Sequence, residues 1–501
     1  MRNGDEASSE KRLGLLDATM IVAGSMVGSG IFLVTAQMAR DVSGAGWLML
    51  AWGITTALTL AAALSYGELA AMMPLAGGQY VFLREAYSRF WAFLYGWTLF
   101  FIMQTGLIDA VTIGFARYLG VLWPAVAEDH YLVAPIALGK HYALSLSTTQ
   151  LTALLLIVVL SWVNARGVDY GKLVQNVFTL AKLGALVVVI AFGLLVGCNH
   201  AVIHANYVHA WQLSSPAGAG APLWWKALVA VCVAQVGSLF AADAWNNVTF
   251  VAGEIRRPQR NLPLALLLGT GGVMLIYIGA NLAYTFVLPM QAIQSVPADR
   301  VGAAMLNAIY PRYGSTIMAV LILVAAAGCV NGIILSGSRT FATMARDGLF
   351  LESAAKLNRA GVPGVALWVQ AAWAVLLLLV RTHDPVRNTY GNLYSNLLDY
   401  VISAALFFYV LTVAAVWRLR RKRPEAERPY KTWGYPLVPG VYCVFAGLIL
   451  LVLCWYRAAT ALPGFGLIAC CAVVYFLLYR RASSSGTRER RAELQQALPP
   501  A

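Results

Sequence analysis

The chain of 501 residues alternates between long apolar segments and short polar connections. A helix needs about 20 apolar residues to cross the hydrocarbon core of a bilayer. Twelve segments come close to that length, although small or polar residues interrupt some of them. The pattern therefore predicts an all-α membrane protein with twelve transmembrane helices, over residues 13–38, 46–70, 90–118, 149–165, 173–196, 223–252, 263–288, 314–338, 363–381, 393–417, 436–456 and 461–480.

The composition supports a membrane protein and excludes several other classes. Apolar residues make up 60% and charged residues 12% of the chain. A soluble protein has about 45–50% apolar and about 25% charged residues. Disordered chains, collagen and small disulfide scaffolds are excluded by the same figures. The seven cysteines show no CxxC or zinc-finger spacing, so we expect most of them to be buried apolar residues.

The net charge of +14 suggests a nucleic-acid partner, but the positions of the basic residues indicate a membrane topology instead. With the N-terminus inside, 26 of the 36 lysines and arginines fall on the cytoplasmic side and nine on the other. Basic residues gather on the cytoplasmic side of membrane proteins. We therefore expect a multi-pass protein of the plasma (inner) membrane with both termini cytoplasmic, whose basic cluster 418–423 contacts membrane lipids rather than nucleic acid.

Two predicted spans are interrupted by residues that are unfavourable in a bilayer. Residues 24–30 break the first span with three glycines and two serines, and residues 241–247 break the sixth with an aspartate and two asparagines. Such residues cost stability unless they line a cavity. Spans one and six run in opposite directions, which predicts two inverted halves, and paired broken helices are typical of a transporter's binding site. The predicted organisation is a cytoplasmic segment 1–12, inverted halves 13–196 and 223–417, a helix pair 436–480 and a flexible cytoplasmic tail 482–501.

The break in the first span offers backbone groups to a zwitterionic ligand. Unwinding would free N–H groups around Ser29 and Gly30, which suit a carboxylate. Carbonyl groups at the end of the preceding half-helix, at Ser25 and Met26, would suit an ammonium. Gly28 lies four residues after another glycine, and small residues at that spacing also mediate ordinary helix packing, which stays the alternative for these glycines.

The sixth and fifth spans supply ionisable groups at membrane depth. Asp243 is a candidate substrate-binding residue, with capping of the broken helix as the alternative. Phe240 and Trp245 flank the break as further candidates, although periodicity alone favours core packing for both. Lys182 lies roughly nine residues, at ~1.5 Å each, from the cytoplasmic edge, too deep to snorkel. Its ammonium must pair or lose its proton, so we expect a coupling or gating role, with a structural bridge as the alternative.

Residues for enzymatic or metal chemistry are scarce. The six histidines all fall outside the predicted spans, and the chain contains no HExxH motif and no GxSxG or P-loop in a suitable context. We therefore expect neither an enzyme nor a resident metal or cofactor.

A set of motifs extends over essentially all of the predicted spans. They are Gly28-Ser29-Gly30-Ile31-Phe32, Ser65-Tyr66-Gly67-Glu68-Leu69-Ala70, Pro74 to Tyr80, Phe178 to Leu183, Asn246 to Pro263, Asn331-Gly332 with Ser338-Arg339, and Arg428-Pro429-Tyr430-Lys431. Together they resemble the amino acid–polyamine–organocation (APC) superfamily, most closely its L-amino acid transporter (LAT) branch. The resemblance implies a leucine-transporter-type fold of five plus five inverted helices and two more.

The resemblance also implies roles for individual residues. Ser29 and Gly30 would hold the substrate carboxylate, and Phe240 would close over the substrate. Carbonyl groups near Met26, Phe240 and Asp243 would meet the substrate ammonium. Lys182 would occupy the place that a sodium ion takes in sodium-coupled relatives, which implies sodium-independent transport.

The chain departs from the family pattern at positions that bear on substrate and partners. Ala242 and Ala244 replace a bulky residue and a glycine, which leaves the pocket size open. An acidic residue at the place of Asp243 occurs in relatives that take cationic as well as neutral amino acids. Residues 119–148 contain no cysteine, so a disulfide-linked heavy subunit is not expected.

The resulting hypothesis is a sodium-independent exchanger of neutral L-amino acids that works by alternating access, with cationic amino acids left open as further substrates. The alternatives are a proton-coupled symporter with Lys182 as the proton site, and an amino acid sensor that does not transport.

Overall fold

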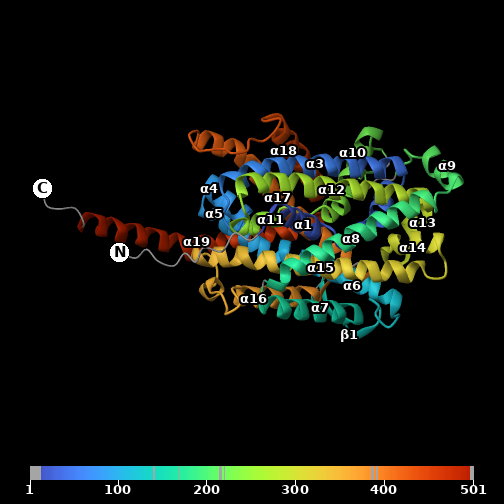
Figure 1. Ribbon diagram of the computed structural model, residues 1–501, viewed down its shortest axis with the longest axis horizontal. Helices are drawn as coiled ribbons and strands as arrows, with labels where there is room; N and C mark the ends of the chain where they lie inside the picture. The colour runs from blue at the N-terminus through green and yellow to red at the C-terminus, as the bar shows by residue number, and fades with distance from the viewer. Residues whose placement is uncertain are drawn as a thin grey trace.

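The computed structural model is mostly helical. It describes residues 13–138, 142–167, 169–213, 217–218, 220–384, 389–390 and 393–496, so the predicted segment 1–12 lies outside the described residues. Long helices run along the longest axis of the molecule (Figure 1). Helices α4 and α5 lie at one end of that axis and helices α9, α13 and α14 at the other, and we call these ends the α4 side and the α9 side.

The helices follow one another along the chain with short connections. They are α1 (Leu15–Met26), η1 (Gly30–Phe32), α2 (Val34–Val42), α3 (Ala45–Met72), α4 (Gln79–Ala86), α5 (Arg89–Thr98), η2 (Leu99–Met103), α6 (Gln104–Leu122), α7 (Thr148–Ala165), α8 (Asp169–Leu195), α9 (His200–Val208), α10 (Leu223–Ala241), α11 (Asn247–Phe250), η3 (Ala252–Glu254), α12 (Pro258–Val287), α13 (Met290–Ser295), η4 (Pro297–Asp299), α14 (Val301–Ile309), α15 (Gly314–Arg346), η5 (Glu352–Ala355), α16 (Gly364–Leu378), α17 (Leu393–Lys422), α18 (Leu437–Tyr456) and α19 (Ala458–Gln496).

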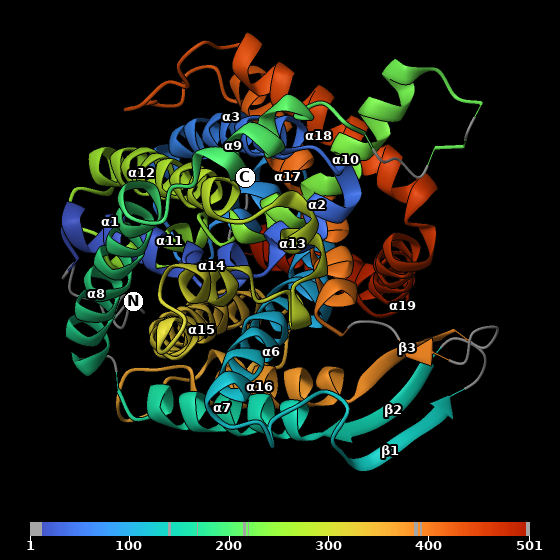
Figure 2. The ribbon, with the colours of Figure 1, turned by 90° about the vertical axis from the view of Figure 1, so that its right-hand side faces the viewer.

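Ten helical segments of the described residues are long and apolar enough to cross a membrane. Two shorter apolar helices, α1 and α16, fall in the predicted spans 13–38 and 363–381. Seen from the α9 side, α6 and α15 lie between α8 at one edge of the molecule and α19 at the other (Figure 2). The chain is therefore built as a multi-pass membrane protein.

Both predicted breaks are confirmed. The first span is divided into α1, η1 and α2, because α1 ends at Met26 and the next helical turn begins at Gly30. The sixth is divided into α10, α11 and η3, with an irregular stretch between Ala241 and Asn247. Ala244 in that stretch has a φ of 65°, a backbone conformation that a regular helix does not contain.

The prediction of an all-α fold is wrong in one respect. A four-stranded antiparallel sheet in the order β1-β2-β3-β4 joins Tyr131–Leu138, Tyr142–Ser147, Val380–Asp384 and Thr389–Tyr390. Strand β2 alternates buried and partly exposed side chains, as one face of a sheet requires. Its partner β3 is more than 200 residues away, so the pairing could not be read from local sequence. At the other end of the chain, α19 continues to Gln496, and the flexible cytoplasmic tail 482–501 stays a prediction.

A buried carboxylate joins three segments on the α4 side. Glu68, near the end of α3, accepts hydrogen bonds from Nε and Nη2 of Arg420 at 2.8 and 2.7 Å. The backbone N–H and the hydroxyl of Thr432 each donate to the same carboxylate at 2.7 Å. Glu68 is 1% exposed, so its charge depends on these donors. They hold α17 and the segment before α18 against α3.

We predict that the Glu68→Gln variant is strongly destabilised. The substitution leaves Arg420 facing a neutral amide in a buried site, and removing one member of a buried ion pair costs about 3–5 kcal/mol. A lower melting temperature of the purified protein in detergent checks this. Glu425→Gln is the control, because Glu425 is exposed. Equal melting temperatures for the two variants would contradict the role of Glu68.

Candidate functional site

The carbonyl groups at the end of α1 are held by side chains from three other helices. Lys182 of α8 donates from Nζ to the carbonyl oxygens of Gly24 and Val27 at 2.5 and 2.8 Å. The Ser25 oxygen accepts from Sγ of Cys329 in α15 at 3.0 Å. Lys182 is 4% exposed, so the break in α1 provides the partners that a buried ammonium needs.

Met26 is less available to a ligand than the sequence predicted. Its carbonyl oxygen accepts from the Tyr277 hydroxyl of α12 and from the Gly28 N–H, both at 3.0 Å. A carbonyl oxygen has two lone pairs, and both are therefore engaged. Binding of a substrate ammonium to Met26 requires one of these hydrogen bonds to break.

The N–H groups beyond the break remain available. Within the described residues, no hydrogen bond is recorded for the backbone N–H of Ser29 or Gly30, whereas their carbonyls accept from Phe32 and Leu33. The Ser29 hydroxyl donates to the Val111 oxygen of α6 at 3.5 Å. Ser29 and Gly30 are buried, and buried N–H groups without acceptors are rare. They are suited to bind an anionic group such as a carboxylate.

Phe240 and Ala241 of α10 pack directly on this region. A Cβ atom built on Gly30 would lie 3.1 Å from Cα of Ala241 and 3.7 Å from Cδ1 of Phe240. On the other side, a Cβ atom on Gly28 would lie 2.9 Å from Sγ of Cys329. The glycines therefore let α10 and α15 approach the backbone of the break, and the structure brings Ser29, Gly30 and Phe240 together.

Asp243 is hydrogen-bonded to α17. The Tyr409 hydroxyl of α17 donates to its Oδ1 at 2.5 Å. The carboxylate lines a cavity of about 20 Å³ together with Ala242, Thr59 and Tyr442, which has room for a single water. The small side chain of Ala242 thus borders a cavity between α3, α10, α17 and α18.

Trp245 lines the same cavity and belongs to an aromatic cluster. Its ring centroid lies 4.7 Å from that of Tyr66 and 5.8 Å from that of Tyr409. The structure therefore does not place the Trp245 ring beside Gly30. Asp109 of α6 is fully buried, and neither of its carboxylate oxygens has a hydrogen-bond partner in the described residues.

Several residues of the site could not be identified from the sequence. Tyr277, Cys329, Val111 and Tyr409 contact the two breaks from four different helices. Each is an ordinary apolar or aromatic residue of a predicted span, with no motif around it. Only the three-dimensional packing brings them to the breaks.

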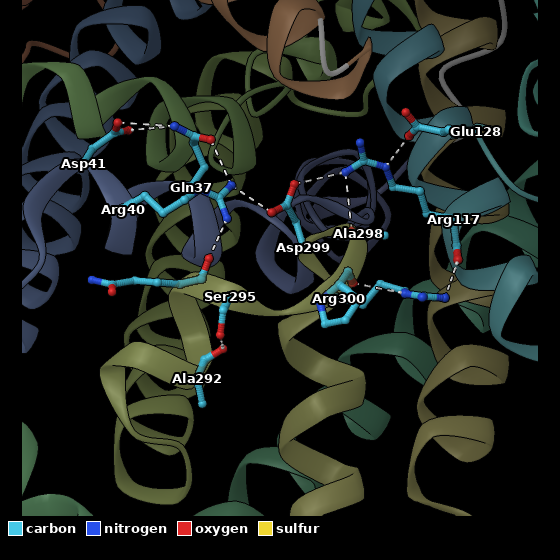
Figure 3. A network of polar contacts seen from close by, with 12 residues as sticks. Gln37, Arg40, Asp41, Arg117, Glu128, Ala292, Ser295, Ala298, Asp299 and Arg300 are labelled. Atoms are coloured by element: carbon cyan, nitrogen blue, oxygen red, sulfur yellow. Dashed lines mark hydrogen bonds and ion pairs between the residues drawn. The ribbon is translucent and has the colours of Figure 1, made fainter. Parts of the chain in front are cut away.

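Ion pairs hold the second half of the first span on the α9 side. Arg40 at the end of α2 donates from Nη2 to Oδ1 of Asp299 at 2.8 Å, and Nη1 of Arg117 in α6 lies 3.3 Å from Oδ2. Arg117 in turn contacts Oε1 of Glu128 at 2.8 Å. Figure 3 shows the two guanidinium groups reaching Asp299 from opposite sides. Asp299 therefore connects α2 to α6.

The α4 side is held by pairing of the chain before α1. The Leu13 N–H donates to the Glu254 oxygen at 3.1 Å, and the Arg256 N–H donates to the Leu13 oxygen at 2.8 Å. Nε of Arg339 in α15 lies 2.8 Å from Oε1 of Glu254. The start of α1, the end of η3 and the end of α15 thus meet on this side.

Comparison with known proteins identifies the family. Residues 13–477 match the profile of the amino acid permease family, and the chain belongs to this family within the APC superfamily. It is 26% identical to the b(0,+)-type amino acid transporter 1 of Mus musculus over 89% of this chain and 82% of that protein. It is 28% identical to the serine/threonine exchanger SteT of Bacillus subtilis (strain 168), over 86% of this chain and 88% of that protein. It is also 27% identical to the large neutral amino acids transporter small subunit 2 of Mus musculus, over 95% of this chain and 82% of that protein.

We predict that the Gly30→Leu variant loses amino acid binding. Its side chain would collide with Ala241 and Phe240 and cover the free N–H groups. Binding of labelled L-leucine, L-serine and L-arginine to the purified protein measures the effect. Gly53→Leu is the matched control, since a Cβ atom there meets nothing within 4 Å. Wild-type affinity in a folded Gly30→Leu protein would exclude this region as the binding site.

Proposed function

We propose that the protein is a sodium-independent exchanger of neutral L-amino acids, with cationic L-amino acids as a second substrate class. The observation that carries the proposal is the contact of the Lys182 ammonium with the carbonyl oxygens of Gly24 and Val27. A fixed positive charge on these carbonyls satisfies them without a metal cation, and it repels one. The free N–H groups of Ser29 and Gly30 then bind the substrate carboxylate, and Phe240 closes over the bound substrate.

Alternating access follows from the two broken helices in this proposal. The twelve spans form two inverted halves of five, as in the leucine-transporter-type fold, with α18 and α19 as the additional pair. The α4 side is the cytoplasmic side, in agreement with the basic residues that gather there, and both termini lie in the cytoplasm. The protein resides in the plasma (inner) membrane and is not an enzyme. It works without a disulfide-linked heavy subunit, because residues 119–148 contain no cysteine.

Uptake into proteoliposomes tests the proposal. We expect vesicles preloaded with unlabelled amino acid to take up labelled amino acid, equally well in sodium and in choline buffer, and empty vesicles to take up little. Exchange needs substrate on both sides, because only the loaded carrier changes its orientation. Uptake into empty vesicles that requires a pH gradient would support proton-coupled symport with Lys182 as the proton site. Binding without uptake under either condition would support a sensor.

The Asp243→Asn variant tests the substrate class. We expect the KM for L-arginine to rise by roughly ten- to a hundredfold, the effect of losing a hydrogen bond to a charged group, and the KM for L-leucine to change much less. The asparagine retains the size of the side chain and its ability to bond Tyr409. Asp243→Glu keeps the charge and is expected to keep L-arginine transport. An equal change for both amino acids would contradict a role of Asp243 in charge recognition.

A further inference from the structure

A second polar cavity lies on the α4 side. It has a volume of about 150 Å³, many times the ~10–15 Å³ that holds one water. The end of η3, the last turns of α15, the residues that follow α3 and the loop before α16 line it. The cavity is not lined by any residue of the α1 break. It therefore lies apart from the proposed substrate site.

The walls of this cavity are held in place by close backbone contacts. The Gly77 N–H donates to the Phe250 oxygen at 3.2 Å. Gly78 has a φ of +46°, and a Cβ atom there would collide with Thr249 and Phe250. The Thr343 hydroxyl donates to the Ala76 oxygen at 3.4 Å. These contacts fix the segment after α3 between α11 and α15, so the cavity is formed before any ligand binds.

Charges of both signs line the cavity. Nε of Arg339 lies 2.8 Å from Oε1 of Glu254, so the cavity wall contains an ion pair. Arg346 lies seven residues after Arg339 on α15, which is about two turns and therefore the same helix face. Two guanidinium groups and one carboxylate thus line a single cavity.

We propose that this cavity is a second binding site, on the α4 side, for a zwitterionic α-amino acid. The ligand's carboxylate binds Arg339 and Arg346, and its ammonium binds Glu254. The volume accommodates the backbone of an amino acid and a small side chain. The inference rests on the proposed function, because it assigns the cavity to the same substrates, which occupy it on their way between the cytoplasm and the α1 break.

Transport measured separately from each side tests this site. Intact cells preloaded with unlabelled L-serine present the α9 side to labelled L-serine, and preloaded inverted membrane vesicles present the α4 side. We expect Arg346→Gln and Glu254→Gln to raise the KM in inverted vesicles by about ten- to a hundredfold, as for the loss of a charged hydrogen bond. The KM in intact cells stays at the wild-type value. Glu85→Gln is the matched control, because it removes an ion pair with Arg423 on the same side, outside the cavity.

The variants distinguish a binding site from an ion pair that only stabilises the structure. Arg346 forms no ion pair with Glu254 in the described residues, so its replacement leaves the Arg339–Glu254 contact intact. A wild-type KM from both sides for Arg346→Gln would overturn the proposal, as would equal KM changes from both sides. Absence of exchange by the wild-type protein would instead contradict the proposed function.

Discussion

The structure depends on how the carbonyl groups of the broken first span are satisfied. A bilayer offers no water to open backbone groups, and each buried carbonyl without a donor costs about 1–3 kcal/mol. Lys182 supplies two donors, and Tyr277 and Cys329 supply one each. These side chains come from α8, α12 and α15, so the break that weakens one helix connects three others. The cost of burying the Lys182 ammonium is offset by the same contacts.

The backbone groups on the two sides of the break therefore differ in how far their hydrogen bonds are satisfied. The carbonyls before it are engaged, while the Ser29 and Gly30 N–H groups after it have no recorded acceptor in the described residues. The site therefore favours an anion over a cation, which fits a carboxylate better than an ammonium. In this arrangement a substrate ammonium finds no open acceptor at Met26. In the proposed function, an ammonium that binds Met26 has to displace Tyr277 or Gly28 from its carbonyl oxygen.

The sequence allowed the breaks, the buried lysine and nearly all helices to be predicted, because glycines and charges at membrane depth have few explanations. It did not allow the hydrogen-bond partner of Asp243 to be predicted. Helical periodicity ends at Ala241, and the positive φ of Ala244 turns the next residues independently of it. Tyr409, the partner of Asp243, lies 166 residues further along the chain. The sheet was not predicted either, because β2 and β3 are far apart in the sequence.

The two halves of the first span are held by contacts of different strength. The Lys182 contacts with the first half are fully buried, whereas Arg40, which holds α2 to Asp299, has a side chain that is 36% exposed. Exposed ion pairs contribute little because water screens them. Arg457 also contacts Asp41 of α2, with side chains that are 31% and 14% exposed. The ion pairs of α2 therefore contribute less than the buried contacts at the end of α1. The N–H groups of Ser29 and Gly30 lie at the junction between these halves, so in the proposed function a bound carboxylate lies between the strongly held α1 and the more weakly held α2.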